Sequence, residues 1–128
     1  MAYQFTDICY ISEDVLSLIK FYETVFNVRA AKDSDEIHSG VNVGGLNISI
    51  DSAKLTGNSA FHYVSGTSSD NTIVGFDVDD VDAEYTRLLA LGVTMLNEPT
   101  THPWGARSFQ FKDPDGNILN FRSVIKEG

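Results

Sequence analysis

The stretch that decides the fold is FKDPDGNILNF, at residues 111–121. Its centre, DPDGN, is typical of a tight turn: proline presets φ, aspartate side chains bond nearby backbone amides, and Gly116 can adopt a positive φ. Apolar runs lie on both sides of this turn. The stretch therefore predicts a β-hairpin with strands at residues 106–112 and 117–123.

Upstream of the hairpin, a strand followed by an amphipathic helix occurs twice. Residues 4–11 and 72–78 alternate as half-buried strands do. The first helix is expected to begin at residues 12–14 and end at Phe26, with Asn27 as a left-handed terminus. The second is expected to begin at Asp79 or Asp80 and end at Gly92. Further strands fit residues 28–32, 36–43, 45–51 and 93–96, with a turn at Gly44 and Gly45.

The two halves keep a common register. Asp14 and Asp80, at the two helix starts, lie 66 positions apart, and the turn glycines Gly45 and Gly116 lie 71 apart. This pattern predicts one α+β domain, residues 1–128, made of two βαβββ units. The units are residues 1–51 and 71–128, joined by a connection at residues 52–70.

Three segments together are similar to one known family: residues 14–27, FDVDDVD at residues 76–82, and residues 104–121 from WGAR through the hairpin. In order and spacing they resemble the glyoxalase/bleomycin-resistance/dioxygenase proteins, the vicinal-oxygen-chelate superfamily. The resemblance covers nearly the whole chain. It implies curved mixed sheets around a cleft and a homodimer.

Metalloenzymes of this family hold a divalent metal at four cleft positions, which the resemblance places on Asp7, Ser49, Ile73 and Asn120. Ile73 cannot coordinate a metal, and Ser49 and Asn120 are weak neutral donors. Iron and zinc in such sites need imidazole or carboxylate ligands. None of the three histidines, His38, His62 and His102, falls on a ligand position. We therefore expect no metal cofactor.

Strand alternation predicts which side chains face the cleft. Apolar residues would pack under the helices, and a mostly polar set would line the cleft. Any one of these side chains would more often simply face solvent, but as a group they favour ligand binding. Ser108 and Gln110 join the set if Phe109 and Phe111 face the helix. The set is Asp7, Cys9, Asn47, Ser49, Asp51, Asp77, Asn120 and Arg122.

Trp104 is the strongest single candidate for ligand contact, because it lies between Pro103 and Gly105 at the entrance to a strand. An indole stacked on a flat or cationic ligand contributes about 0.5–2 kcal/mol. A subunit interface would explain the same residue equally well. His102 can reach a ligand from the preceding loop, and Phe61 and Tyr63 could form an opposing wall.

The composition limits the kinds of partner that we expect. The 128 residues carry a net charge of −9 and a single cysteine, Cys9. We expect no nucleic-acid or membrane partner, and a reducing cytoplasm fits the lone thiol. The excess of acids in the cleft favours a polar or cationic ligand.

Two functions remain open. The first is a metal-independent protein that binds a small polar or cationic, aromatic molecule, such as a sequestered drug. The second is a lyase, isomerase or ring-cleaving dioxygenase related to glyoxalase I. It would use a metal held by Asp7 with unusual partners, or a metal-free mechanism with Asp7, Asp51 or Asp77 as base.

Overall fold

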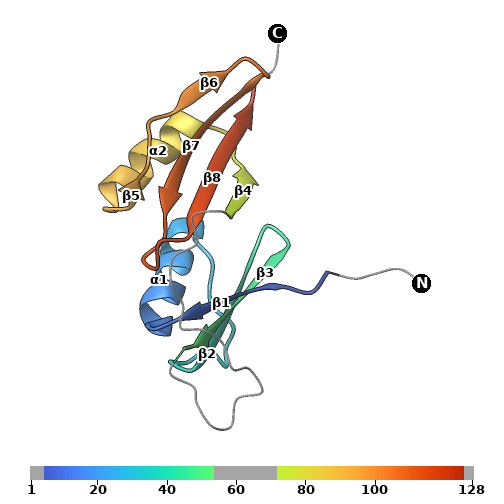
Figure 1. Cartoon of the computed structure of the whole chain (residues 1–128), viewed down its shortest axis with the longest axis vertical. Coiled ribbons are helices and arrows are strands. Elements are labelled where there is room, and N and C mark those ends of the chain that lie inside the picture. Colours follow the sequence, from blue (N-terminus) through green and yellow to red (C-terminus); the bar gives the residue numbers. More distant parts are fainter. Residues whose placement is uncertain (1–4, 54–71, 126–128) are drawn as a thin grey trace, which may run out of the picture. The chain divides into compact units, whose positions relative to one another are not determined.

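The structure is a computed structural model that describes residues 5–53 and 72–125. It divides into two compact units, residues 1–67 and 68–128, each with one helix on a sheet (Figure 1). The fold class is α+β, as predicted. Phe61 and Tyr63, two of the predicted site residues, lie outside the described residues.

The first unit places a helix on a three-stranded sheet. Strands β1 (Ile8–Ser12), β3 (Leu46–Ser52) and β2 (His38–Val43) lie in the order β1-β3-β2, with β1 parallel and β2 antiparallel to β3. Helix α1 (Val15–Phe26) packs on this sheet through Leu18 and Tyr22, which are fully buried with Ile48 and Ile50.

The sequence features that begin and end α1 act as predicted. The Asp14 carboxylate accepts a hydrogen bond from the Ser17 amide, 3.1 Å away, and so caps the helix. Asn27 adopts the left-handed conformation at φ 53°. Its amide side chain makes that region accessible to a residue other than glycine.

The second unit repeats the plan with a larger sheet. Strands β4 (Ile73–Asp77), β8 (Ile118–Val124), β7 (Ala106–Lys112) and β5 (Thr94–Met95) follow one another, and β6 (Thr100–His102) also pairs with β7. Helix α2 (Val81–Ala90), capped by Asp80, covers the sheet. The core of this unit is mainly aromatic and leucine-rich, formed by Leu88, Phe109, Phe111, Leu119 and Phe121.

The predicted hairpin joins β7 and β8. The Asp113 carbonyl accepts from the Gly116 amide at 2.9 Å, and Gly116 has φ 86°. Asp113 itself is buried, and its carboxylate accepts bonds from the backbone amides of Asp115 and Asn117, both at 2.9 Å. The turn is therefore held from inside by one carboxylate.

Strand pairing confirms the repeat register. In the first unit Cys9 lies opposite Ser49, and in the second Gly75 lies opposite Asn120. These pairs are related by the same offsets of 66 and 71 that the helix starts and turn glycines gave. Ser49 and Asn120 are thus equivalent positions in two parallel strand pairs.

Three strand predictions were wrong in detail. Residues 28–32 form no strand, because the Ala30 amide bonds the Glu23 carboxylate and only Ala31 reaches β2, through the Gly40 carbonyl. The strand predicted at 4–11 begins at Ile8, and the one at 93–96 covers only Thr94–Met95. Strand β6 was not predicted, and His102 lies at its end rather than in a loop.

Candidate functional site

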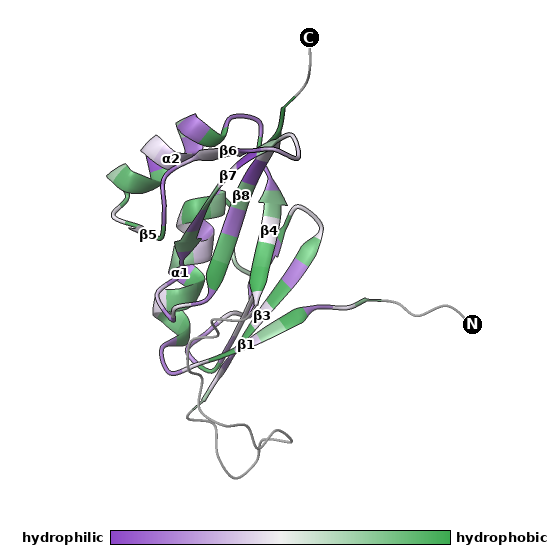
Figure 2. Ribbon diagram, turned by 45° about the horizontal axis from the view of Figure 1, so that its top comes forward, coloured by the Kyte–Doolittle hydropathy of each residue, from purple (hydrophilic) through white to green (hydrophobic). Residues whose placement is uncertain are grey.

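One face of the second unit's sheet carries a set of polar side chains, called here the polar face: Asp77 on β4, Ser108 and Gln110 on β7, and Asn120 and Arg122 on β8. The opposite face buries Phe109, Phe111, Leu119 and Phe121 under α2. Figure 2 shows the resulting bands of hydrophilic and hydrophobic residues along β8. The predicted assignment of faces is therefore confirmed for these strands.

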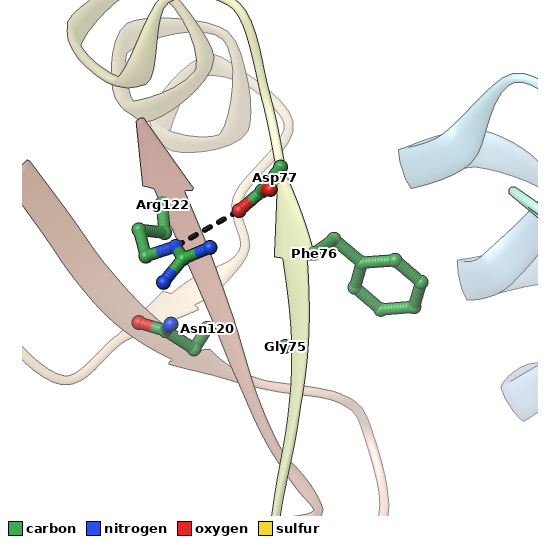
Figure 3. A pocket seen from close by; sticks show the side chains of 5 residues that line it. All are labelled: Gly75, Phe76, Asp77, Asn120 and Arg122. Atoms are coloured by element: carbon green, nitrogen blue, oxygen red, sulfur yellow. Dashed lines mark hydrogen bonds and ion pairs between the residues drawn. The ribbon is translucent and has the colours of Figure 1, made fainter. Parts of the chain in front are cut away.

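A shallow pocket of about 350 Å³ lies on the polar face. Asn120 and Arg122, both predicted site residues, line it with Gly75, Phe76 and Asp77. In Figure 3 the Phe76 ring points away from Asn120 and Arg122, so its backbone rather than its ring borders the polar side. Gly75 leaves open the space in front of the Asn120 amide, since a Cβ there would lie 3.8 Å from Nδ2.

Arg122 and Asp77 form an ion pair across β8 and β4. The Arg122 Nε donates to Asp77 Oδ1 at 2.8 Å (Figure 3). This hydrogen bond lowers the pKa of the Asp77 carboxyl and raises that of Arg122. The two Nη groups of Arg122 donate to no other described residue, so they face the pocket with unused donors.

A row of three amide side chains crosses the polar face; we call Asn97, Gln110 and Asn120 the amide relay. The Asn97 Nδ2 donates to Gln110 Oε1 at 2.6 Å, and the Gln110 Nε2 donates to Asn120 Oδ1 at 2.5 Å. The backbone amide of Gln110 donates to Asn97 Oδ1 at 2.8 Å. Asn97 lies between β5 and β6, and no sequence pattern pointed to it.

Trp104 and His102 form a separate aromatic pair beside the polar face. Their rings stack with centroids 4.4 Å apart and planes 3° apart. The His102 Nε2 lies 3.1 Å from the Ser108 hydroxyl, which ties the pair to β7 opposite Arg122. Trp104 is 75% exposed, so the indole face away from His102 is open. Three predicted site residues are thus in contact, although none of them lines the pocket.

In the first unit, the predicted site residue Asp7 lies just before β1, and Asn47 and Ser49 lie on β3. The Ser49 hydroxyl donates to Asp7 at 2.8 Å and the Thr6 hydroxyl donates to Asp7 at 2.8 Å, which lowers the Asp7 pKa. Asn47 donates to the Thr6 carbonyl at 3.1 Å. Asp7, Asn47 and Ser49 therefore form one hydrogen-bonded group.

Asp51, on the central strand β3, contacts a histidine on β2 and the single cysteine on β1. Its carboxylate contacts His38 Nδ1 and accepts from the Cys9 thiol at 3.5 Å. Burial, followed by the negative charge of Asp51, raises the pKa of Cys9 to about 11. The thiol is therefore protonated at neutral pH and is a poor nucleophile.

The four family metal positions do not supply a metal site. Asp7 and Ser49 already bond one another, Ile73 has no donor atom and is 57% exposed, and the Asn120 oxygen accepts from Gln110. Within residues 5–53 and 72–125, no three side chains of histidine, cysteine, aspartate or glutamate lie close enough to hold a metal ion. This donor set does not fit zinc or iron.

Comparison with known proteins gives the same fold. The glyoxalase/bleomycin resistance protein/dioxygenase superfamily model matches residues 4–121. An uncharacterised protein of Bacillus subtilis, YraH, is 32% identical over 63 residues, which span 48% of this chain and about half, 49%, of YraH.

No helix in the described residues is long and apolar enough to cross a membrane.

Two solved structures are similar over nearly their whole lengths. A glyoxalase/bleomycin resistance protein/dioxygenase from Nocardioides has a TM-score of 0.76 at 21% identity, covering 100% of this chain and 87% of that one. The fosfomycin resistance protein FosX of Listeria monocytogenes has a TM-score of 0.72 at 24% identity, covering 96% and 94%. At these identities the likeness shows a shared fold and nothing about activity.

Proposed function

This chain belongs to the glyoxalase/bleomycin resistance/dioxygenase superfamily, and on that basis we propose that it binds a small polar molecule with an aromatic ring, without a metal ion. The activity proposed is sequestration rather than turnover. The observation that carries this proposal is the exposed Trp104 indole, which is held flat on His102 beside a polar pocket. A ring that is already oriented loses little entropy when a ligand stacks on it.

The carboxylates that favoured a cationic ligand already have partners. Asp77 is paired with Arg122, Asp51 contacts His38, and Asp7 accepts from two hydroxyls. A cation would have to compete with these interactions at Asp7 and Asp51, and at Asp77 it would lie beside the positive Arg122 guanidinium. This argues for a polar ligand whose charge is not positive.

Trp104 is the only tryptophan in the chain, so its fluorescence reports directly on stacking. We expect small aromatic acids to quench this emission in protein whose metal content, measured by mass spectrometry, is far below one ion per chain. Trp104→Ala should weaken binding, measured by calorimetry, by about 2- to 30-fold, and Trp104→Phe by less.

Phe5→Ala is the matched control, because Phe5 is an equally exposed aromatic, at 73%, in the other unit. It should leave the affinity unchanged. Equal affinity of Trp104→Ala and wild type would remove Trp104 from the site. Stoichiometric zinc, nickel, manganese or iron needed for binding would instead favour the metal-dependent lyase, isomerase or dioxygenase.

We also propose that the protein is a homodimer. Strands β1 and β4 lie at the edges of their sheets, and an edge strand can pair with another chain.

A further inference from the structure

The amide relay has a fixed direction, and this direction decides what Asn120 offers to the pocket. A side-chain amide can turn over and exchange its oxygen for its nitrogen, so its orientation depends on its partners. A backbone N–H can only donate. The Gln110 backbone amide therefore requires the oxygen of Asn97 to face it, at 2.8 Å.

The orientation then passes along the relay. With its oxygen engaged, Asn97 presents its nitrogen to Gln110 Oε1, and Gln110 presents its own nitrogen to Asn120 Oδ1. Turning any one amide over would place two oxygens or two nitrogens together. The Asn120 nitrogen is left without a partner among the described residues, and Figure 3 shows it on the side nearer Arg122.

We propose that this relay makes Asn120 a hydrogen-bond donor that, with the unused Nη groups of Arg122, selects a carboxylate group of the ligand and rejects a cation. The inference rests on the proposed function and adds the chemical class of the group bound. Arg122 supplies positive charge and a planar pair of donors suited to two carboxylate oxygens. Asp77 engages only Nε and so orients the guanidinium without occupying its outer edge.

Benzoate and benzamidinium provide a matched pair of probes. They share the aromatic ring and nearly the same shape, but one ends in two acceptors with negative charge and the other in donors with positive charge. We expect wild-type protein to bind benzoate about 10- to 100-fold more tightly than benzamidinium, as hydrogen bonds to charged groups suggest. Calorimetry measures both affinities.

The sharpest variant lies away from the pocket, at the start of the relay. In Asn97→Asp, one oxygen still accepts from the Gln110 backbone amide, but the other now faces Gln110 where a nitrogen was. Gln110 must turn to donate to it, and Asn120 must turn in response and present its oxygen to the pocket. The preference for benzoate should then fall at least tenfold.

The negative charge that Asn97→Asp adds is controlled within the same loop. The double variant Asn97→Asp/Glu98→Gln has the wild-type net charge but a reversed relay, so it should lose the preference as the single variant does. Glu98→Gln alone keeps the relay and should keep the preference. Loss of preference in Glu98→Gln, or wild-type preference in the double variant, would overturn the inference.

The direction of the hydrogen bonds in the relay can also be measured in protein without a ligand. Scalar couplings across hydrogen bonds, measured by NMR, should connect Gln110 Nε2 with the Asn120 side-chain carbonyl carbon. A coupling from Asn120 Nδ2 to the Gln110 carbonyl carbon would contradict the proposed direction.

The outcomes separate this inference from the proposed function. Binding of both probes with equal affinity, or a preference for benzamidinium, overturns the relay inference and leaves metal-free binding intact. Failure of wild-type protein to bind either probe counts against both. Trp104→Ala should weaken both probes while keeping their ratio, because the indole contacts the shared ring and not the end group.

Discussion

Asp77 and Arg122 form an exposed ion pair, and each shifts the pKa of the other. The hydrogen bond from Arg122 lowers the Asp77 pKa below its ordinary value of 3.8. The native state therefore binds fewer protons at Asp77 than the unfolded chain does in the acid range. The stabilisation from this pair is fully present above the unfolded-state pKa of 3.8. It is lost as the pH falls through the lower pKa that Asp77 has in the folded state.

Arg122→Gln should remove most of this shift. We expect the Asp77 pKa to rise toward 3.8 in the variant, measured by NMR titration of the side-chain carboxyl carbon. Arg87→Gln is a suitable control, because Arg87 pairs with Glu84 on α2 and not with Asp77. An Asp77 pKa equal in wild type and Arg122→Gln would show that the ion pair does not persist in solution.

Cys9 gives a second test at the scale of single residues. Burial and then the charge of Asp51 raise its pKa to about 11, so alkylation by iodoacetamide at neutral pH should be slow. Asp51→Asn removes the charge and should lower the Cys9 pKa and speed alkylation. Alkylation in wild type at the rate of a free cysteine would contradict the assigned environment.

The hairpin turn between β7 and β8 depends on one buried carboxylate. Asp113→Ala removes the acceptor for the Asp115 and Asn117 amides. We expect the free energy of unfolding to fall by about 1–3 kcal/mol, since two part-buried backbone amides are left unpaired. Urea denaturation measures this, and Asp33→Ala, at an exposed position, should change stability by less than about 0.5 kcal/mol.

At the C-terminus of α1, two substitutions of Asn27 should change the stability of the protein in opposite directions. Asn27 has φ 53°, a conformation that glycine adopts without strain. Asn27→Gly should therefore be neutral or stabilising, whereas Asn27→Ala should destabilise the fold by about 1 kcal/mol. Thermal unfolding of the two variants provides the measurement, and a more stable alanine variant would contradict the helix end described here.

At the scale of elements, local patterns predicted what local interactions determine. Alternation in β3 and β8 placed Ser49 and Asn120 on the polar side, and capping chemistry placed Asp14 and Asn27 at the ends of α1. Strand β6 lies between two prolines and exists through its pairing with β7. A strand of three residues is too short to show an alternating pattern, so the sequence of Thr100–His102 alone could not predict it.

The candidate site was predictable only in part, for the same reason. Strand alternation and the repeat register predicted Asn120, Arg122 and Ser108, and a position in the loop before a strand predicted His102 and Trp104. Asn97 was missed because its role comes from contacts with Gln110, thirteen positions away. Its own neighbourhood in the sequence looks like an ordinary loop.

At the scale of the whole molecule, the proposed homodimer can be tested directly. Sedimentation equilibrium should give twice the chain mass of 14.1 kDa. A single-chain mass at all accessible concentrations would count against the dimer but not against ligand binding. Because the net charge is −9, crowding two copies together is costly, and association should strengthen with added salt.

The amide relay also has an evolutionary consequence. Its direction originates in a main-chain N–H, which no substitution except proline can remove. Exchange of a single side-chain nitrogen for oxygen at Asn97 would reduce, at least tenfold, the selectivity of a site that Asn97 does not touch. A lineage could therefore change its ligand while every pocket-lining residue stayed the same, and a comparison restricted to the pocket would not detect the change.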